Sequence, residues 1–202
     1  MDFVPWVKYP ALTKERLGTV AAILRQVRND TLSLHDPSAG DSAWSLGCRV
    51  YSRACHALRE AATSNEWLKI VREEDKPLRF TFAIGAVPIR FYHGDAGDPP
   101  TRYLNISYGE LSQRRLAFDL GVPLDGILRV AVETDASGLV STITLVEMDQ
   151  ANTVTNTYII QLEEGTTGNI LPLRSKGIEL PPPTIEPLTT TEEKERWERN
   201  AG

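Results

Sequence analysis

The sequence predicts an α+β domain in which an N-terminal helical hairpin packs on a largely antiparallel sheet, followed by an extended C-terminal tail. Three observations lead to this prediction. Apolar residues recur at helical spacing up to residue 62. From Arg79 onward the spacing changes to the two-residue period of half-buried strands. Helices and strands are also grouped along the chain instead of alternating, which disfavours a parallel, doubly wound sheet.

Two long helices are predicted first. The first begins after Thr13, a residue type that caps helices well, and it has to end before Pro37. The second begins near Asp41 or Ser42 and carries a wide apolar face. Because the turn between them is short, the two helices are expected to form an antiparallel hairpin. A short third helix is predicted over 66–74.

The strands follow. A hairpin is predicted from strands over 79–84 and 87–93, and Pro88 places the second strand at a sheet edge or lies at its start. A short strand over 102–107 and a helix over 109–119 come next. The last strands form a meander over 127–134, 140–147 and 153–162. The pattern leaves open whether hairpin and meander share one sheet.

The predicted organisation has three parts: a helical part (1–76) and a sheet part (77–164), which together make a single domain over 1–164, and a Pro/Thr-rich tail (165–202). Near its end the tail has a capping-box pattern and a short predicted helix, in which Trp197 is the one large apolar side chain. A helix this short is marginal in isolation. We therefore expect Trp197 to dock on a partner protein or on a second copy of the chain.

The cysteines and the charge limit the possible functions. Cys48 and Cys55 lie about 10 Å apart along the predicted helix, which is too far for a disulfide, and both fall on its apolar stripe. Buried reduced thiols fit the cytoplasm. No secretory leader and no apolar run of membrane-spanning length is visible. A net charge of −5 disfavours a protein that coats nucleic acid by bulk charge.

No cofactor or metal is predicted. The three histidines are scattered, and the sequence contains no Cys-x-x-Cys pair, no zinc-protease motif and no glycine-rich phosphate loop. The excess of arginine over lysine is typical of GC-rich bacterial genomes.

One candidate site lies at the end of the first helix. Arg28, Asn29 and His35 resemble the loose arginine, polar residue, histidine pattern of HEPN ribonucleases. In such a site the arginine would hold the phosphate and the histidine would transfer a proton without a metal. The structural interpretation is that Arg28 and His35 stabilise the C-terminal end of a helix.

A second candidate is the group Arg90, Tyr92, His93, Asp95 and Arg102. Arg90 and Tyr92 share one face of the predicted strand and His93 points to the other face. The two arginines fit an anionic small ligand. A solvated hairpin end is the structural interpretation. A third candidate is a basic helix face with Arg49, Arg53, His56 and Arg59, which fits an acidic partner or a solvated surface.

The sequence as a whole favours a non-enzymatic cytoplasmic interaction or regulatory protein that acts with a protein partner, or as a homo-oligomer, through its tail. The alternatives are a HEPN-like ribonuclease using Arg28 and His35, and a sensor of an anionic ligand near Arg90 and Arg102.

Overall fold

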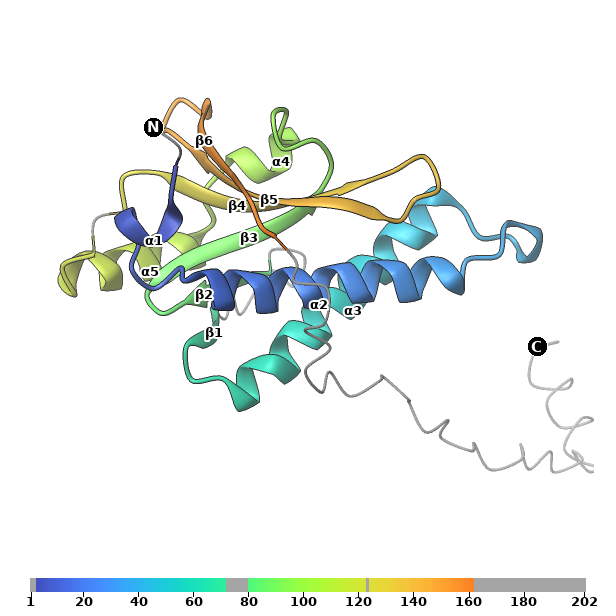
Figure 1. The fold of residues 1–202 in the computed structure, drawn as a ribbon, viewed down its shortest axis with the longest axis horizontal. Coiled ribbons are helices and arrows are strands. Elements are labelled where there is room, and N and C mark those ends of the chain that lie inside the picture. The colour runs from blue at the N-terminus through green and yellow to red at the C-terminus, as the bar shows by residue number, and fades with distance from the viewer. Residues whose placement is uncertain (1–2, 72–79, 123, 162–202) are drawn as a thin grey trace, which may run out of the picture. The chain divides into compact units, whose positions relative to one another are not determined.

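Two long helices precede a six-stranded sheet in the computed structural model of the chain (Figure 1). The structure describes residues 3–71, 80–122 and 124–161. Contacts divide the chain into two units, 1–168 and 169–202, and every described residue belongs to the first. The predicted α+β class is confirmed. The predicted tail and its Trp197 lie outside the described residues.

The predicted helical hairpin is confirmed. A single turn, α1 (Pro5–Lys8), precedes α2 (Lys14–Ser33) and α3 (Ala43–Ser64). The Thr13 side chain accepts a hydrogen bond from the amide of Arg16 and so caps α2. Ser42 and Ser45 form a reciprocal capping box at the start of α3. A 3₁₀ turn, η1 (Pro37–Ala39), reverses the chain between the two helices.

All six strands lie in one sheet, in the order in which they occur in the chain. They are β1 (Leu68–Val71), β2 (Thr81–Ile84), β3 (Val87–His93), β4 (Ile127–Thr134), β5 (Val140–Met148) and β6 (Val154–Ile159). Neighbours are antiparallel except β3 and β4, which are parallel. This parallel pair joins the predicted hairpin to the predicted meander. Its crossover carries α4 (Thr101–Leu104) and α5 (Tyr108–Asp119).

Helices cover both faces of the sheet (Figure 1). The larger core lies between the sheet and the helices α2 and α3, where Leu24 and Leu58 pack with Phe91 and Val130. A smaller core lies on the opposite face and includes Tyr103 of α4. Because side chains alternate along a strand, β3 contributes Phe91 to one core and Tyr92 to the other. No helix among the described residues has both the length and the apolar content needed to cross a membrane.

Two short elements differ from the prediction. The helix predicted over 66–74 is wrong, because Leu68–Val71 is strand β1 and pairs with β2. The strand predicted over 102–107 is also wrong, because Thr101–Leu104 is a helical turn after Pro100. Both segments are only a turn or a few residues long. Contacts with the rest of the fold therefore outweigh their local preferences.

The structure also decides the position of Pro88. Strand β3 is interior, so it is not an edge strand. Pro88 is its second residue, and the ladder to β4 begins one residue later, at Ile89. A proline at this position therefore breaks no ladder bond to β4.

The buried face of α3 is narrower than predicted. Cys55 is buried, but Cys48 is exposed and Trp44 is 78% exposed. The buried residues of α3 are instead Leu46, Val50, Ala54, Cys55 and Leu58. The prediction that both cysteines are buried is therefore correct for Cys55 and wrong for Cys48. Burial raises the pKa of the Cys55 thiol to about 11, so this thiol stays protonated and unreactive.

Candidate functional site

Three of the five predicted anion-binding residues, Arg90, Tyr92 and Arg102, lie around Tyr103 of α4. The guanidinium groups of Arg90 and Arg102 each lie 5.0 Å from the centre of the Tyr103 ring. The ring of Tyr92 lies 5.4 Å from the same ring, and its hydroxyl donates a 3.0 Å hydrogen bond to the backbone oxygen of Asp95. Sequence analysis missed Tyr103, because its segment was predicted as a strand.

Arg90 is held within the domain by a second group of charges that sequence analysis also missed. Arg129 is 0% exposed and Glu110 is 2% exposed. Their side chains form an ion pair of 2.5 Å, and Arg129 also donates to the backbone oxygens of Tyr103 and Leu128. A nitrogen of Arg90 lies 3.6 Å from the Glu110 carboxylate and 3.3 Å from the oxygen of Asn105. This group fixes α5 to the sheet.

The position of Arg129 in the sequence is itself informative. It stands within the strand Ile127–Thr134, whose first six residues are all buried. A charge at such a position needs a partner in the fold, because an unpaired buried ion is strongly unfavourable. Burial lowers the pKa of Arg129, although Glu110 opposes that shift. The identity of the partner is not visible in the sequence, since Glu110 lies in a different element.

His93 points to the opposite face of the sheet, as predicted. Its ring lies 6.4 Å from that of Phe91, in an edge-to-face arrangement. Both ring nitrogens are buried and have no hydrogen-bond partner among the described residues. Burial, together with the positive charges of Arg28 and Arg102, lowers the pKa of His93 to about 4. The imidazole is therefore neutral at neutral pH.

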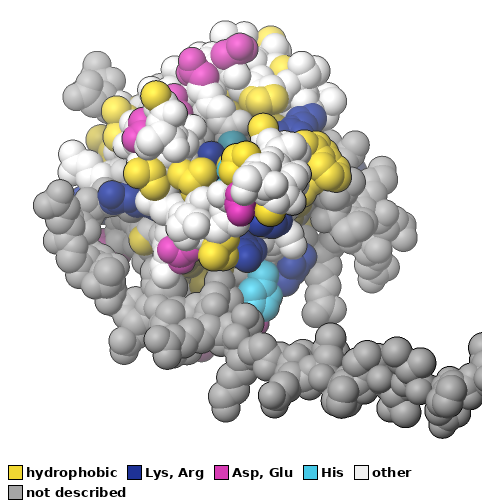
Figure 2. All heavy atoms as spheres, turned by 90° about the vertical axis from the view of Figure 1, so that its right-hand side faces the viewer, with side chains coloured by type: hydrophobic (Ala, Val, Ile, Leu, Met, Phe, Trp, Pro, Cys, Tyr) yellow, Lys and Arg dark blue, Asp and Glu magenta, His cyan; other side chains and the backbone are white. Residues whose placement is uncertain are grey.

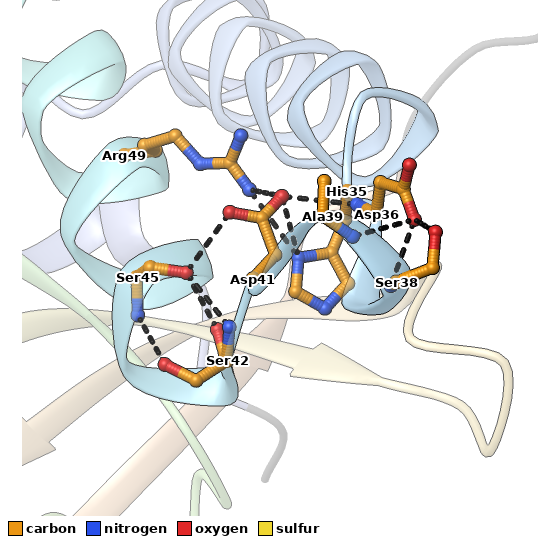
Figure 3. A network of polar contacts seen from close by, with 8 residues as sticks. All are labelled: His35, Asp36, Ser38, Ala39, Asp41, Ser42, Ser45 and Arg49. Carbon is orange, nitrogen blue, oxygen red and sulfur yellow. Dashed lines mark hydrogen bonds and ion pairs between the residues drawn. The ribbon is translucent and has the colours of Figure 1, made fainter.

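Arg28 and His35, the proposed ribonuclease pair, have separate partners. The Arg28 Nε donates a 3.1 Å hydrogen bond to the backbone oxygen of Gly138, in the turn between β4 and β5. His35 belongs to the turn between α2 and α3 (Figure 3). No contact among the described residues joins the two side chains.

The network around His35 closes the helical hairpin. Its Nδ1 lies 3.5 Å from a carboxylate oxygen of Asp41, and Arg49 donates to the same oxygen at 2.6 Å. The Ser45 hydroxyl lies 3.3 Å from the other oxygen of Asp41 (Figure 3). Ser45 thus contacts the carboxylate and not the imidazole. The arrangement therefore holds the turn and presents no activated nucleophile.

Some basic side chains of the predicted face of α3 make contacts within the domain. Arg49 pairs with Asp41, and the guanidinium of Arg59 lies 5.0 Å from the centre of the Phe80 ring. His56 is exposed. Two of the four basic side chains are therefore occupied within the domain.

Another buried carboxylate, Glu147, anchors the N-terminal segment. It accepts hydrogen bonds from Lys8 at 2.6 Å, from the Tyr9 hydroxyl at 2.5 Å and from Asn156 at 2.9 Å. Burial favours a raised pKa for Glu147, but these donors outweigh burial and lower its pKa. Because Lys8 and Tyr9 lie far from Glu147 in the sequence, and Asn156 reaches it through the pairing of β5 with β6, no local motif reveals the cluster.

Comparison with family models, with curated proteins and with solved structures finds no match for this chain. The assignment of a function therefore depends on the geometry of the domain itself. Among the described residues, no group of three or more histidine, cysteine or acidic side chains is placed to hold a metal ion.

The remaining candidate surface is an apolar row on α5. Tyr108 is 80% exposed and Phe118 is 79% exposed, and Leu111 lies between them on the same side of the helix. Leu116 and Leu120 are also exposed, on another side of the helix. The buried residues of α5, Gly109, Glu110 and Ala117, all lie on the other side. The sequence pattern of this helix predicted its existence but not which side faces the core.

Proposed function

We propose that the chain is a non-enzymatic interaction protein and that α5 is its docking surface for a second copy of the chain. The observation that carries the proposal is the apolar row on α5. Burying one such side chain contributes about 1.5–3 kcal/mol, and this gain is not realised while the row faces water. Grouped exposed apolar side chains are typical of protein-binding surfaces.

The charges within the row favour a second copy as the occupant. Arg115 and Asp119 are exposed and lie one helical turn apart. Neither has an ion pair among the described residues. In an antiparallel pair of α5 helices related by a twofold axis level with Ala117, Arg115 faces the partner's Asp119, and the reciprocal contact is identical. Phe118 then lies beside the partner's Phe118.

The contacts made by the polar side chains support a binding role rather than a catalytic one. His35, Arg49, Arg90 and Arg129 all use hydrogen bonds or ion pairs to hold the domain together. We further propose that the protein acts in the cytoplasm, where its free cysteines would stay reduced. The tail with Trp197 is proposed as a second contact with a partner protein.

Sedimentation measurements on charge-reversal variants test the proposed surface. We expect the wild type to show a weak monomer–dimer equilibrium at concentrations up to roughly 100 µM, since a pair of short helices buries less area than a standard interface. Arg115→Asp should abolish the dimer, because it places two acidic side chains opposite each other. The double variant Arg115→Asp with Asp119→Arg should restore it.

The matched control is Ile159→Asp, which places a charge on exposed strand β6, away from α5, and should leave the dimer intact. A wild type that stays monomeric throughout the concentration range would overturn the proposal. So would a double variant that fails to recover association.

A further inference from the structure

We propose that Arg28, His93 and Arg102 form a binding site for a phosphate dianion at the end of the sheet where β3 finishes. This inference is independent of the proposed role of α5. The site takes its residues from three elements, with Arg28 from α2, His93 from the end of β3 and Arg102 from α4.

The topology brings the three side chains to one end of the molecule. His93 is the last residue of β3 and pairs with Val132 of β4, and the amide of Gly94 donates to the Val132 oxygen at 3.2 Å. The turn that follows β4 accepts the hydrogen bond from Arg28. Arg102 stacks on Tyr103, whose ring packs against Tyr92, the residue before His93. Figure 2 views the molecule from this end and shows basic and histidine side chains beside hydrophobic ones.

The hydrogen-bonding capacity of His93 is unused. A neutral imidazole carries one donor and one acceptor nitrogen. Both nitrogens are buried here without a partner among the described residues, an arrangement that folded proteins rarely keep. A phosphate oxygen would accept a hydrogen bond from the ring, and a protonated ring would also be stabilised by the negative charge.

The two guanidinium charges are also unpaired. Arg28 donates to a backbone oxygen and Arg102 stacks on an aromatic ring, but neither has a carboxylate within ion-pair distance among the described residues. Arg28 is partly buried, and this burial lowers its pKa. Two unpaired positive charges beside a neutral histidine favour a ligand with two negative charges.

Three acidic side chains at this end of the sheet, Asp95, Asp98 and Glu133, act on Tyr92. Asp95 accepts a hydrogen bond from the amide of Gly97 at 2.7 Å, and Glu133 accepts one from the amide of Ala96 at 3.1 Å. Burial raises the pKa of Tyr92, and the charges of Asp95 and Glu133 raise it further, so these acids act on the Tyr92 side of the strand. None of these acids forms an ion pair with Arg28 or Arg102 among the described residues.

The test uses the full chain and four probes: inorganic phosphate, methyl phosphate, sulfate and acetate. Calorimetric titration should show binding of both phosphates and of sulfate at concentrations up to roughly 10 mM, and much weaker binding of the singly charged acetate. Stronger binding of methyl phosphate than of inorganic phosphate would identify an ester as the ligand, and the reverse order would identify free phosphate. No binding by any dianion would overturn the proposal.

Single substitutions locate the site. Arg28→Gln and Arg102→Gln should each weaken phosphate binding by roughly tenfold or more, as expected for loss of a charge-assisted hydrogen bond. Arg25→Gln is the matched control, because Arg25 is exposed on the same helix as Arg28 and should bind phosphate like the wild type. Arg102 is exposed, so its variant keeps the test valid even if Arg28→Gln fails to fold. Unchanged binding by Arg102→Gln would contradict the proposed site.

The protonation of His93 provides a readout that a purely structural histidine would not give. Long-range proton–nitrogen NMR spectra should show the His93 pKa rising when sulfate binds, because the anion stabilises the imidazolium. Sulfate itself does not titrate in this range, so it should bind more tightly at about pH 5.5 than at about pH 7.5. A His93 titration that is the same with and without sulfate would overturn its place in the site.

Discussion

Single side chains in this domain show two ways of placing polar groups in a core. Arg129 and Glu147 are buried with several partners each, so their charges are compensated by hydrogen bonds and ion pairs. His93 has no such partner among the described residues and stays neutral instead. The first arrangement contributes rigidity, whereas the second leaves a residue that responds to pH.

The stability of the domain should therefore depend on pH through His93. Its folded pKa of about 4 lies below the ordinary value of 6.5, so between these two values the unfolded chain binds a proton that the folded chain does not. Stability should fall as the pH decreases through this window, by about 3 kcal/mol in total. Urea unfolding of the wild type and of His93→Leu at several pH values measures the effect. An equally steep loss of stability in the variant would assign it to other groups.

At the scale of elements, α5 is held by polar contacts from Glu110, Gln113 and Arg114. Its buried residues are few, and its ion pair with Arg129 joins two side chains that are both buried. The capping box formed by Ser107 and Glu110 uses the same carboxylate. The Glu110 side chain thus stabilises the first turn of α5 and also links α5 to β4.

Replacement of this carboxylate should be costly. Glu110→Gln leaves Arg129 buried without a counter-charge, and we expect a loss of about 3–5 kcal/mol of stability. Glu60→Gln, on an exposed position of α3, is the control and should change stability by less than about 0.5 kcal/mol. Chemical denaturation of both variants measures the difference. A small effect of Glu110→Gln would show that Arg129 finds another partner or remains hydrated.

Long periodic elements were predictable from the sequence, and short ones were not. The two helices and the meander carry many repeats of their period, so Thr13, Ser42 and the turn before Val140 could be located. Segments 68–71 and 101–104 have one or two repeats, and their structure depends on β2 and on Tyr103. For the candidate site, Arg90, Tyr92 and Arg102 lie near one another in the structure, as their closeness in sequence suggests, while their role in binding an anion stays a prediction.

The parts of the site that depend on tertiary structure were not predictable. Arg28 lies far from His93 in sequence, and only the packing of α2 against the sheet brings them to the same end. The exposure of Phe118 was also not predictable from the sequence. Apolar residues occur around most of the circumference of α5, and the sequence does not show which of them face β3. The ribonuclease and tail-docking hypotheses remain predictions.

At the scale of the whole molecule, the described domain ends just after β6. Ile160 is buried, and its amide donates to the Ile143 oxygen at 2.8 Å. Strand β6 also contributes Tyr158, whose ring contacts Trp6 at the N-terminal end of the described chain. The last structural anchor among the described residues therefore lies only a few residues before Glu164.

Two truncations should differ sharply in stability. A chain ending at Glu164 keeps β6 and Ile160 and should melt at nearly the temperature of the full chain. A chain ending at Asn152 loses β6, exposes β5 as a new edge and should melt at a much lower temperature or fail to fold. Thermal unfolding followed by circular dichroism compares them. A molten chain after the first truncation would show that the tail belongs to the core.

The order in which this sheet assembles follows from its one parallel pair. Strands β1 to β3, and separately β4 to β6, are linked by connections between sequence neighbours. Ile89 meets Leu128 only after the whole crossover with α4 and α5 has been closed. Closing the longer loop carries the larger entropic penalty. We therefore expect the two halves of the sheet to form first and the pairing of β3 with β4 to be the rate-limiting step of folding. The ion pair of Arg129 with Glu110 ties the middle of that crossover to β4 in the folded domain, so we expect this contact to form in the same step that joins the two halves.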